Sequence, residues 1–302
     1  MAANDQPAPA GKLMILLRRL GSFVLLWSIV LGALFSGNKL ISNGVFLGVM
    51  LLIAGLGLHE FYNLVAKRGL VCFKGLGIAG GLFLMASTFV FVSGVRGGQP
   101  AAAHANDFEI TIIILFVLGL CVRQFVSKSN TAGLLAISTT LFGLMYVPWL
   151  LNFIQKINFF PGIEGTYYVL YFILVTKFSD TGAYCVGSLI GKHKMIPRIS
   201  PNKTWEGFAG AILFSAASSL IYAHFAKAHL AGMTWYHAAI LGIVLSVAAV
   251  VGDLIESLFK REAGVKDSGQ FFPGIGGMLD LMDSLLFNAP IMYVYMRYVL
   301  TN

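Results

Sequence analysis

The sequence predicts an all-α fold, a polytopic transmembrane helical bundle of about nine helices with a cytoplasmic N-terminus. Hydrophobic residues make up 57% of the 302 residues and charged residues only 11%, with a mean hydropathy of +0.80. Soluble domains carry about 25% charged residues. Apolar runs of roughly 18 residues or more, long enough to cross about 30 Å of hydrocarbon, recur along the whole chain.

The predicted spans follow one another in order, separated by short polar gaps. They cover residues 20–37, 43–61, 74–95, 110–127, 131–153, 166–190, 207–226, 234–256 and 281–300. Residues 1–11 show no hydrophobic periodicity, so we expect a disordered tail there. The first span follows Arg18 and Arg19 as a signal peptide would, but its apolar run is long and lacks a small-x-small cleavage site. We therefore expect an uncleaved helix.

Gaps rich in Lys and Arg alternate along the chain with gaps that have few of them. This alternation is expected of a membrane protein, because cytoplasmic loops carry an excess of Lys and Arg. With the N-terminus inside, 15 of the 21 Lys and Arg residues fall in cytoplasmic gaps, 5 fall in external gaps, and Lys177 lies within a span. The basic residues that give the net charge of +8 are then expected to lie at helix ends, beside anionic lipid headgroups. No nucleic acid partner is expected, because no basic tract is interleaved with aromatic residues. The length, with little extension, indicates a multi-pass protein of the bacterial inner membrane.

The two halves of the chain differ in where their ionisable residues lie. Residues 12–160 form spans with almost no acids, and we expect them to be a transmembrane scaffold. In residues 161–302 ionisable groups enter the apolar spans, and we expect a catalytic transmembrane region. In the scaffold, Glu60 at the end of the second span is either functional or an interfacial acid whose head reaches water.

Lys177 and Asp180 lie inside the sixth predicted span, three residues apart and so on one helix face. A charged residue at the middle of a membrane helix costs on the order of 2.5 to 3.5 kcal/mol, so neither is expected to face lipid. Either the two side chains neutralise each other's charge inside the bundle, or they mark a functional site. We favour the interpretation as a functional site.

The gap from Gly187 to Gly207 carries the second group of polar residues. Ser200 followed by Pro201 has the form of a helix N-cap with proline at the first helical position. A helix start there would place free N–H groups beside Arg198 and Lys203, an arrangement that binds phosphate. The alternative is a capped membrane helix whose lysines contact lipid headgroups.

Acidic residues are densest at the last cytoplasmic gap. Asp253, Glu256 and Ser257 share one helix face, and Asp280 and Asp283 share another. Carboxylates gathered at two helix ends repel one another unless cations lie among them, and Mg²⁺ prefers such oxygen ligands together with substrate phosphates. Nearby basic and glycine residues would contact phosphate; they are Lys260, Arg261, Lys266, Gly274, Gly276 and Gly277.

Motifs for covalent catalysis are missing from the sequence. No segment has the Gly-x-Ser-x-Gly, His-Glu-x-x-His or Walker-type pattern, and the six histidines are scattered. Metal-assisted phosphoryl transfer fits, because positioning and charge neutralisation supply most of its catalysis.

These motifs resemble those of the phosphatidate cytidylyltransferases, also called CDP-diacylglycerol synthases. The similarity is carried by Ser257-x-x-Lys260-Arg261, Lys266-Asp267-x-Gly269, Pro273-Gly274-x-Gly276-Gly277, Asp280-x-x-Asp283, and upstream by Asp180-x-x-Ala183-Tyr184 and Ser200-Pro201-x-Lys203-Thr204-Trp205-Glu206-Gly207. It covers residues 165 to 290. The chain departs from the usual pattern at Asn202, Ile275 and Leu281, where the family has Lys, His and Arg.

The resemblance implies that CTP and phosphatidate are converted to CDP-diacylglycerol and pyrophosphate, with Mg²⁺ and, as a further candidate, a monovalent cation such as K⁺. It implies that Asp253, Asp280 and Asp283 hold metal, that Lys203, Lys260, Arg261 and Lys266 neutralise CTP and pyrophosphate, and that Lys177 and Asp180 line the lipid headgroup cavity. We add Asp267 to the catalytic set. Substrate binding is assigned to Lys177, Asp180, Arg198, Ser200, Lys203, Thr204, Glu256, Ser257, Gly276 and Gly277.

The expected partners are CTP, phosphatidate and membrane lipids, and a homodimer is one candidate assembly. Two other functions stay open. One is a different CTP-dependent lipid transferase, such as a polyprenol kinase or an ether-lipid cytidylyltransferase. The other is an ion-coupled transporter, which also places acids inside helices, although no inverted repeat is evident.

Overall fold

The computed structural model describes residues 27–28, 31–32, 34–35, 37–94, 102–127, 132–269 and 276–301. The predicted disordered tail and most of the first predicted span lie outside the described residues. The same is true of Pro273, Gly274 and Ile275.

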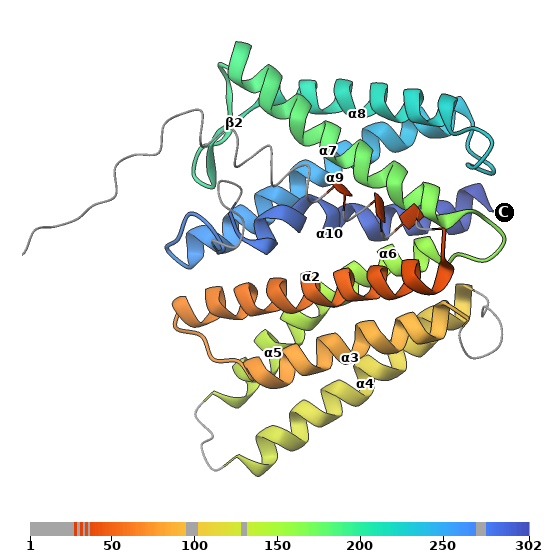
Figure 1. Ribbon diagram of the computed structural model, residues 1–302. Helices are drawn as coiled ribbons and strands as arrows, with labels where there is room; N and C mark the ends of the chain where they lie inside the picture. The colour runs from red at the N-terminus through yellow and green to blue at the C-terminus, as the bar shows by residue number, and fades with distance from the viewer. Residues whose placement is uncertain are drawn as a thin grey trace, which may run out of the picture.

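Long helices dominate the described part of the chain and run side by side (Figure 1). The first are α2 (Lys39–Lys67), α3 (Lys74–Val92), α4 (Ala102–Val126), α5 (Gly133–Leu144), the π-helical turn η1 (Met145–Trp149) and α6 (Leu150–Asn158). After α7 (Gly165–Ile190) come the short strands β1 (Lys194–Ile196) and β2 (Ser200–Thr204). The chain continues through α8 (Trp205–Phe225), α9 (Trp235–Glu262), α10 (Met278–Tyr295) and the π-helical turn η2 (Met296–Leu300).

Seven helices in the described residues are long and apolar enough to cross a membrane, which confirms a polytopic helical membrane protein. They are α2, α3, α4, the continuous unit Gly133–Asn158, α7, α8 and α9. This unit contains η1, where Pro148 cannot donate a backbone hydrogen bond and the helix is π-helical. The ninth predicted span corresponds to α10 and η2, whose first turns carry Asp280 and Asp283.

The gap after α7 is folded, and one expectation about it was wrong. The all-α fold is confirmed, and within the gap β1 and β2 pair as a short antiparallel hairpin with Lys194 opposite Thr204. Because of this hairpin, the next helix does not begin at Ser200. It begins at Trp205, because the Thr204 hydroxyl accepts a hydrogen bond from the Gly207 amide at 3.1 Å and so caps α8.

Small residues let α7 and α8 pack closely. A Cβ atom on Gly182 would lie 2.6 Å from the Gly210 carbonyl oxygen, so a larger residue would push the helices apart. The largest fully buried side chains include Tyr62, Tyr168 and Phe172, from α2 and α7. The core therefore joins the two halves of the chain, and contacts from α10 reach both α2 and α6.

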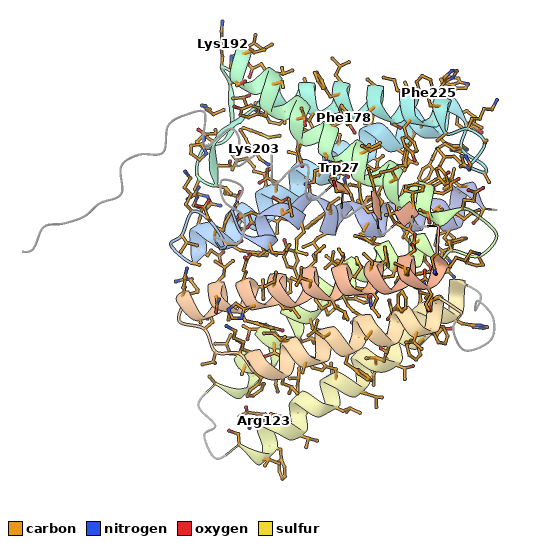
Figure 2. The ribbon with its side chains drawn as sticks, in the orientation of Figure 1. Trp27, Arg123, Phe178, Lys192, Lys203 and Phe225 are labelled. Atoms are coloured by element: carbon orange, nitrogen blue, oxygen red, sulfur yellow. The ribbon has the colours of Figure 1, made fainter. Side chains whose placement is uncertain are left out.

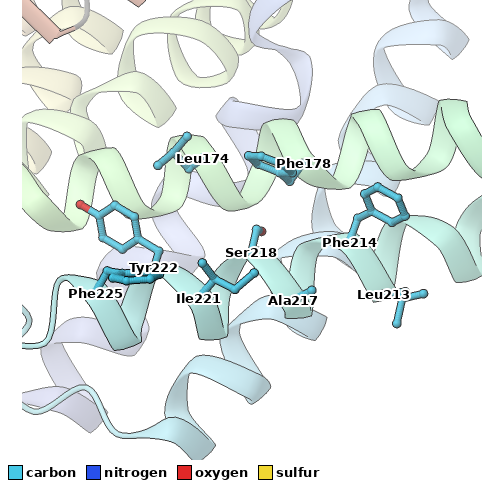
Figure 3. A pocket seen from close by; sticks show the side chains of 9 residues that line it. All are labelled: Leu174, Phe178, Leu213, Phe214, Ala217, Ser218, Ile221, Tyr222 and Phe225. Carbon is cyan, nitrogen blue, oxygen red and sulfur yellow. The ribbon is translucent and has the colours of Figure 1, made fainter.

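The helix ends that carry the predicted cytoplasmic charges lie together. Figure 2 shows Arg123, Lys192 and Lys203 at one end of the bundle and Phe225 at the other. The outer face between α7 and α8 has an apolar hollow of about 550 Å³ lined by Phe178, Leu213 and Phe225 (Figure 3). Its large exposed side chains are those expected of helices in contact with lipid.

Candidate active site

Three carboxylates meet where α9 and α10 pack together. Asp253, Glu256 and Asp283 each offer an oxygen atom, and these three atoms lie within 4.8 Å of one another. Glu256 is fully buried and Asp283 nearly so. Like charges this close are costly without a cation among them. One carboxylate oxygen of Glu256 is ion-paired with Lys260, and in the described part of the chain the other accepts no hydrogen bond, as expected of an atom available to a metal ion.

Asp280 is not one of these three acids, although the resemblance implies that it holds metal. One of its oxygens accepts a hydrogen bond from Lys260 Nζ at 2.6 Å. The other accepts from the backbone amides of Gly277 at 2.8 Å and Ser268 at 3.1 Å. One oxygen is thus paired with α9, and the other caps the start of α10 and holds the neighbouring loop.

Lysine side chains link the acids. Lys260 forms ion pairs with Glu256, one turn earlier on α9, and with Asp280. Lys203, at the end of the hairpin, lies 2.8 Å from an oxygen of Asp253. Ser257 donates a hydrogen bond to the other oxygen of Asp253 at 3.3 Å.

Lys177 and Asp180 pair on α7, as predicted, with 3.4 Å between Nζ and Oδ2. Lys177 also donates a hydrogen bond to the carbonyl oxygen of Leu281 at 3.1 Å, and Ser284 donates to Asp180 at 3.2 Å. The pair therefore lies against the first turns of α10, beside Asp283.

The charges around the cluster do not balance. Three ammonium groups face five carboxylates, a formal excess of two negative charges before Glu60 is counted. The groups are Lys177, Lys203 and Lys260 against Asp180, Asp253, Glu256, Asp280 and Asp283. One divalent cation would offset this excess, and hard oxygen ligands suit Mg²⁺.

Other predicted residues surround the cluster without entering it. Arg261 donates to the carbonyl oxygen of Ile199 at 3.1 Å, which ties the end of α9 to the hairpin. Arg198, Lys266 and Asp267 are exposed, whereas Ser200 is half-buried. The hydroxyl of Thr204 is occupied by the α8 cap, so its role in this structure is local.

The two described glycines of the 273–277 motif shape the start of α10. Gly276 has a φ angle of +116°, a region that side chains rarely adopt. Gly277 precedes the first helical residue, and its amide is one of the donors to Asp280.

An apolar cavity of about 320 Å³ begins at the Lys177–Asp180 pair. Its walls come from α2, α6, α7 and α10 and include Met50, Val169 and Leu281. Val169 lies eight residues from Lys177 on α7, which corresponds to about 12 Å along a helix. A charged pair at one part of an elongated apolar space suits an amphipathic ligand.

Comparison with known proteins identifies the family. Residues 18–299 match the cytidylyltransferase family. The chain belongs to this family.

Three bacterial members of the family show how far the similarity extends. The chain is 37% identical to the phosphatidate cytidylyltransferase of Staphylococcus saprophyticus over 196 residues, which are 65% of this chain and 72% of that protein. It is 47% identical to that of Staphylococcus epidermidis over 131 residues, 43% of this chain and 49% of that protein. For the phosphatidate cytidylyltransferase of Mycobacterium leprae the values are 36% over 194 residues, 61% and 60%.

At this candidate site the structure places further polar residues that the motifs did not assign. Glu60 of α2 accepts a hydrogen bond from the Met278 amide at the start of α10. The Ser268 hydroxyl donates to Glu60, and the Ser284 hydroxyl of α10 donates to Asp180 of α7. The signal for Glu60 was present in the sequence, because it is the only acid in the apolar helix α2. The serines carry no comparable signal.

Proposed function

We propose that this membrane protein forms CDP-diacylglycerol and pyrophosphate from CTP and phosphatidate at the cluster of Asp253, Glu256 and Asp283. The observation that carries the proposal is the cluster itself, held by motif residues at the packed ends of α9 and α10. The activity is the one for which the bacterial relatives are named.

The cavity beside Lys177 suits the lipid substrate. The phosphate of phosphatidate would lie near the ammonium group of Lys177, and an acyl chain would extend between α2, α7 and α10. Each buried methylene contributes about 0.8 kcal/mol to binding, so an apolar space of this kind favours the lipid strongly over water. Leu281 lines this space where the family usually has arginine, so its side chain adds apolar surface rather than charge.

CTP would approach from the end of the bundle that carries the hairpin. Lys203 and Lys260 already contact site acids, and exposed Arg198 and Lys266 add positive charge at the same end. We infer that this end faces the cytoplasm, because the basic gaps of the sequence collect there. The hairpin and the loop after α9 then bring cations to the triphosphate.

The chemistry is an in-line displacement at phosphorus. A phosphate oxygen of phosphatidate attacks the α-phosphorus of CTP, a new P–O bond forms, and the bond to the bridging oxygen breaks as pyrophosphate leaves with the electron pair. Near neutral pH the phosphomonoester is already an anion, because its second pKa is about 6. No strong general base is required, in keeping with the scattered histidines.

The residues present fit Mg²⁺. Glu256 supplies a buried oxygen that accepts no hydrogen bond within the described residues, and Asp253 and Asp283 supply oxygens from two helices. Mg²⁺ bound there would neutralise phosphate charge during transfer. Lys203 and Lys260 hold two of the three acids in place and add to the same neutralisation.

The test uses CTP labelled at two positions. Purified protein in phosphatidate-containing micelles is given [α-³²P]CTP or [γ-³²P]CTP. We expect label from the α position in the lipid and label from the γ position in pyrophosphate. With polyprenol added to the same micelles, a polyprenol kinase would transfer only the γ label to lipid, and an ion-coupled transporter would transfer neither, so either result would overturn the proposal.

Two further expectations concern the working protein. A K⁺ requirement is tested by replacing K⁺ with choline in the same assay. A homodimer is tested by measuring the mass of the protein–detergent complex.

A further inference from the structure

We propose that Glu60 is a positioning residue, which fixes the start of α10 and the 266–269 loop so that Asp283 stays beside Asp253 and Glu256. The inference rests on the proposed function, because it assigns the role of Glu60 within that site. It connects a residue of the N-terminal half to an acidic cluster whose three members all lie in the C-terminal half.

Glu60 caps α10 from another helix. One of its carboxylate oxygens accepts a hydrogen bond from the Met278 amide at 2.9 Å, and the other accepts from the Leu279 amide at 2.8 Å. These are the first two amides of α10, and such amides have no partner within their own helix. The N-cap residue is Gly277, which has no side chain to supply one. A distant carboxylate, buried in the bundle, does this instead.

The same carboxylate holds the loop that follows α9. The Ser268 hydroxyl lies 2.8 Å from Glu60 Oε2 and 3.0 Å from Asp280 Oδ2, so two acids share it. Ser268 is itself buried. The loop is therefore fastened to α2 on one side and to the first turn of α10 on the other.

Two glycines show how tightly this region is packed around Glu60. A Cβ atom on Gly269 would lie 2.3 Å from Glu60 Oε1, and one on Gly277 would lie 2.4 Å from Glu60 Oε2. Neither position has room for a side chain without movement of the carboxylate. Both belong to the motif stretch between α9 and α10, and this contact gives a physical reason for glycine at each.

The contacts lead directly from Glu60 to the acidic cluster. Asp280 joins the shared serine to Lys260, and Lys260 pairs with Glu256. Asp283 lies one turn beyond the amides that Glu60 holds. In the described part of the chain Glu60 has no ion-pair partner, so its charge is met by the N–H groups of a helix N-terminus. It acts on the reaction only through these residues.

The experiment compares Glu60→Gln with the wild type and with Glu262→Gln, which removes an exposed acid from α9. Glutamine keeps the volume of the side chain but offers only one acceptor oxygen. Hydrogen exchange followed by mass spectrometry reports on the amides of residues 278 and 279 whether or not the protein is active. We expect Glu60→Gln to speed their exchange about tenfold while peptides of α8 keep wild-type rates.

Kinetics give a second readout. Outer-shell residues of metal sites typically change affinity or activity by 10- to 100-fold. We expect Glu60→Gln to lower kcat about tenfold and to raise the Mg²⁺ concentration for half-maximal rate, with the KM for phosphatidate unchanged. Ser268→Ala, which removes one of the three hydrogen bonds, should show smaller changes in the same direction.

Unchanged exchange at residues 278 and 279 would overturn the proposal. So would faster exchange throughout the protein with unchanged kcat per folded molecule, because that pattern describes general destabilisation. If the wild type transferred no α label, the proposed function would fail, but the exchange result would still decide whether Glu60 holds α10.

Discussion

Asp280 and Asp283 lie three residues apart in one motif, yet their side chains have different surroundings. Asp280 meets two backbone amides, a serine and Lys260 at the start of its helix. Asp283 is buried deeper and lies among other carboxylates. Charge-assisted hydrogen bonds stabilise the first, whereas the second needs a cation to offset repulsion. We therefore propose that Asp280 positions α10 and that Asp283 holds a metal ion.

A second charged pair lies far from the site and has a structural role. Lys156 of α6 lies 2.7 Å from Glu109 of α4, with both side chains almost fully buried. Lys156 also donates to Asn106 at 3.2 Å and lies 3.5 Å from the centre of the Phe153 ring. This pair ties α4 to α6, whereas α4 packs mainly against α3 and α5.

We predict that Lys156→Met destabilises the protein by about 3 to 5 kcal/mol, because it leaves the Glu109 carboxylate buried without a cation. The measurement is unfolding by SDS in mixed micelles, followed by circular dichroism. Lys156→Met combined with Glu109→Gln should recover most of the loss. Lys227→Met, which removes an exposed lysine, is the control. Equal stability of Lys156→Met and the control would refute the role given to the pair.

At the level of elements, hydrophobic periodicity located the spans well, because a membrane demands long apolar runs. The predicted spans 43–61, 74–95, 166–190, 207–226 and 234–256 each correspond to one helix. Helix ends were harder to predict. Ser200-Pro201 has a capping pattern, but the chain pairs as a hairpin there and Thr204 provides the cap four residues later. The local sequence does not show whether Ser200 or Thr204 caps the helix, because the pairing of the hairpin strands determines where the helix begins.

The site shows the same limit. The three-residue spacings correctly placed Asp253 with Glu256 and identified the motif acids on α10. The register of α9 against α10 decides which acids of the two helices meet. The spacing of residues within one helix carries no information about that register. The contact of Glu60 with residues more than 200 positions away in the sequence depends on the packing of α2 against α10 and was likewise beyond sequence reasoning.

At the level of the whole molecule, the two halves form one bundle with the site at one end. Residues 12–160 were expected to be scaffold only, and this division stays a prediction. The cavity walls include α2 and α6, so the first half shapes the lipid space that we propose. The orientation that we propose for the bundle in the membrane rests on its charges alone.

We predict that the end carrying Lys67 faces the cytoplasm and the end carrying Lys227 faces outside. Both lysines are exposed. In a variant without native cysteines, Lys67→Cys and Lys227→Cys are treated with a membrane-impermeant maleimide in intact bacterial spheroplasts. Lys227→Cys should be labelled and Lys67→Cys protected until the membrane is opened. The reverse pattern would invert the topology and exclude access of cytosolic CTP to the site.

Binding of Mn²⁺ in place of Mg²⁺, followed by electron paramagnetic resonance of the purified protein, tests the metal cluster most directly. The free-ion signal should fall as wild-type protein is added, with and without CTP. Asp283→Asn should weaken binding at least tenfold, since it removes a carboxylate ligand. Glu262→Gln should bind as the wild type does. If Asp283→Asn bound Mn²⁺ with the affinity of the wild type, the ion would not be held by Asp283. That result would contradict the account of this site.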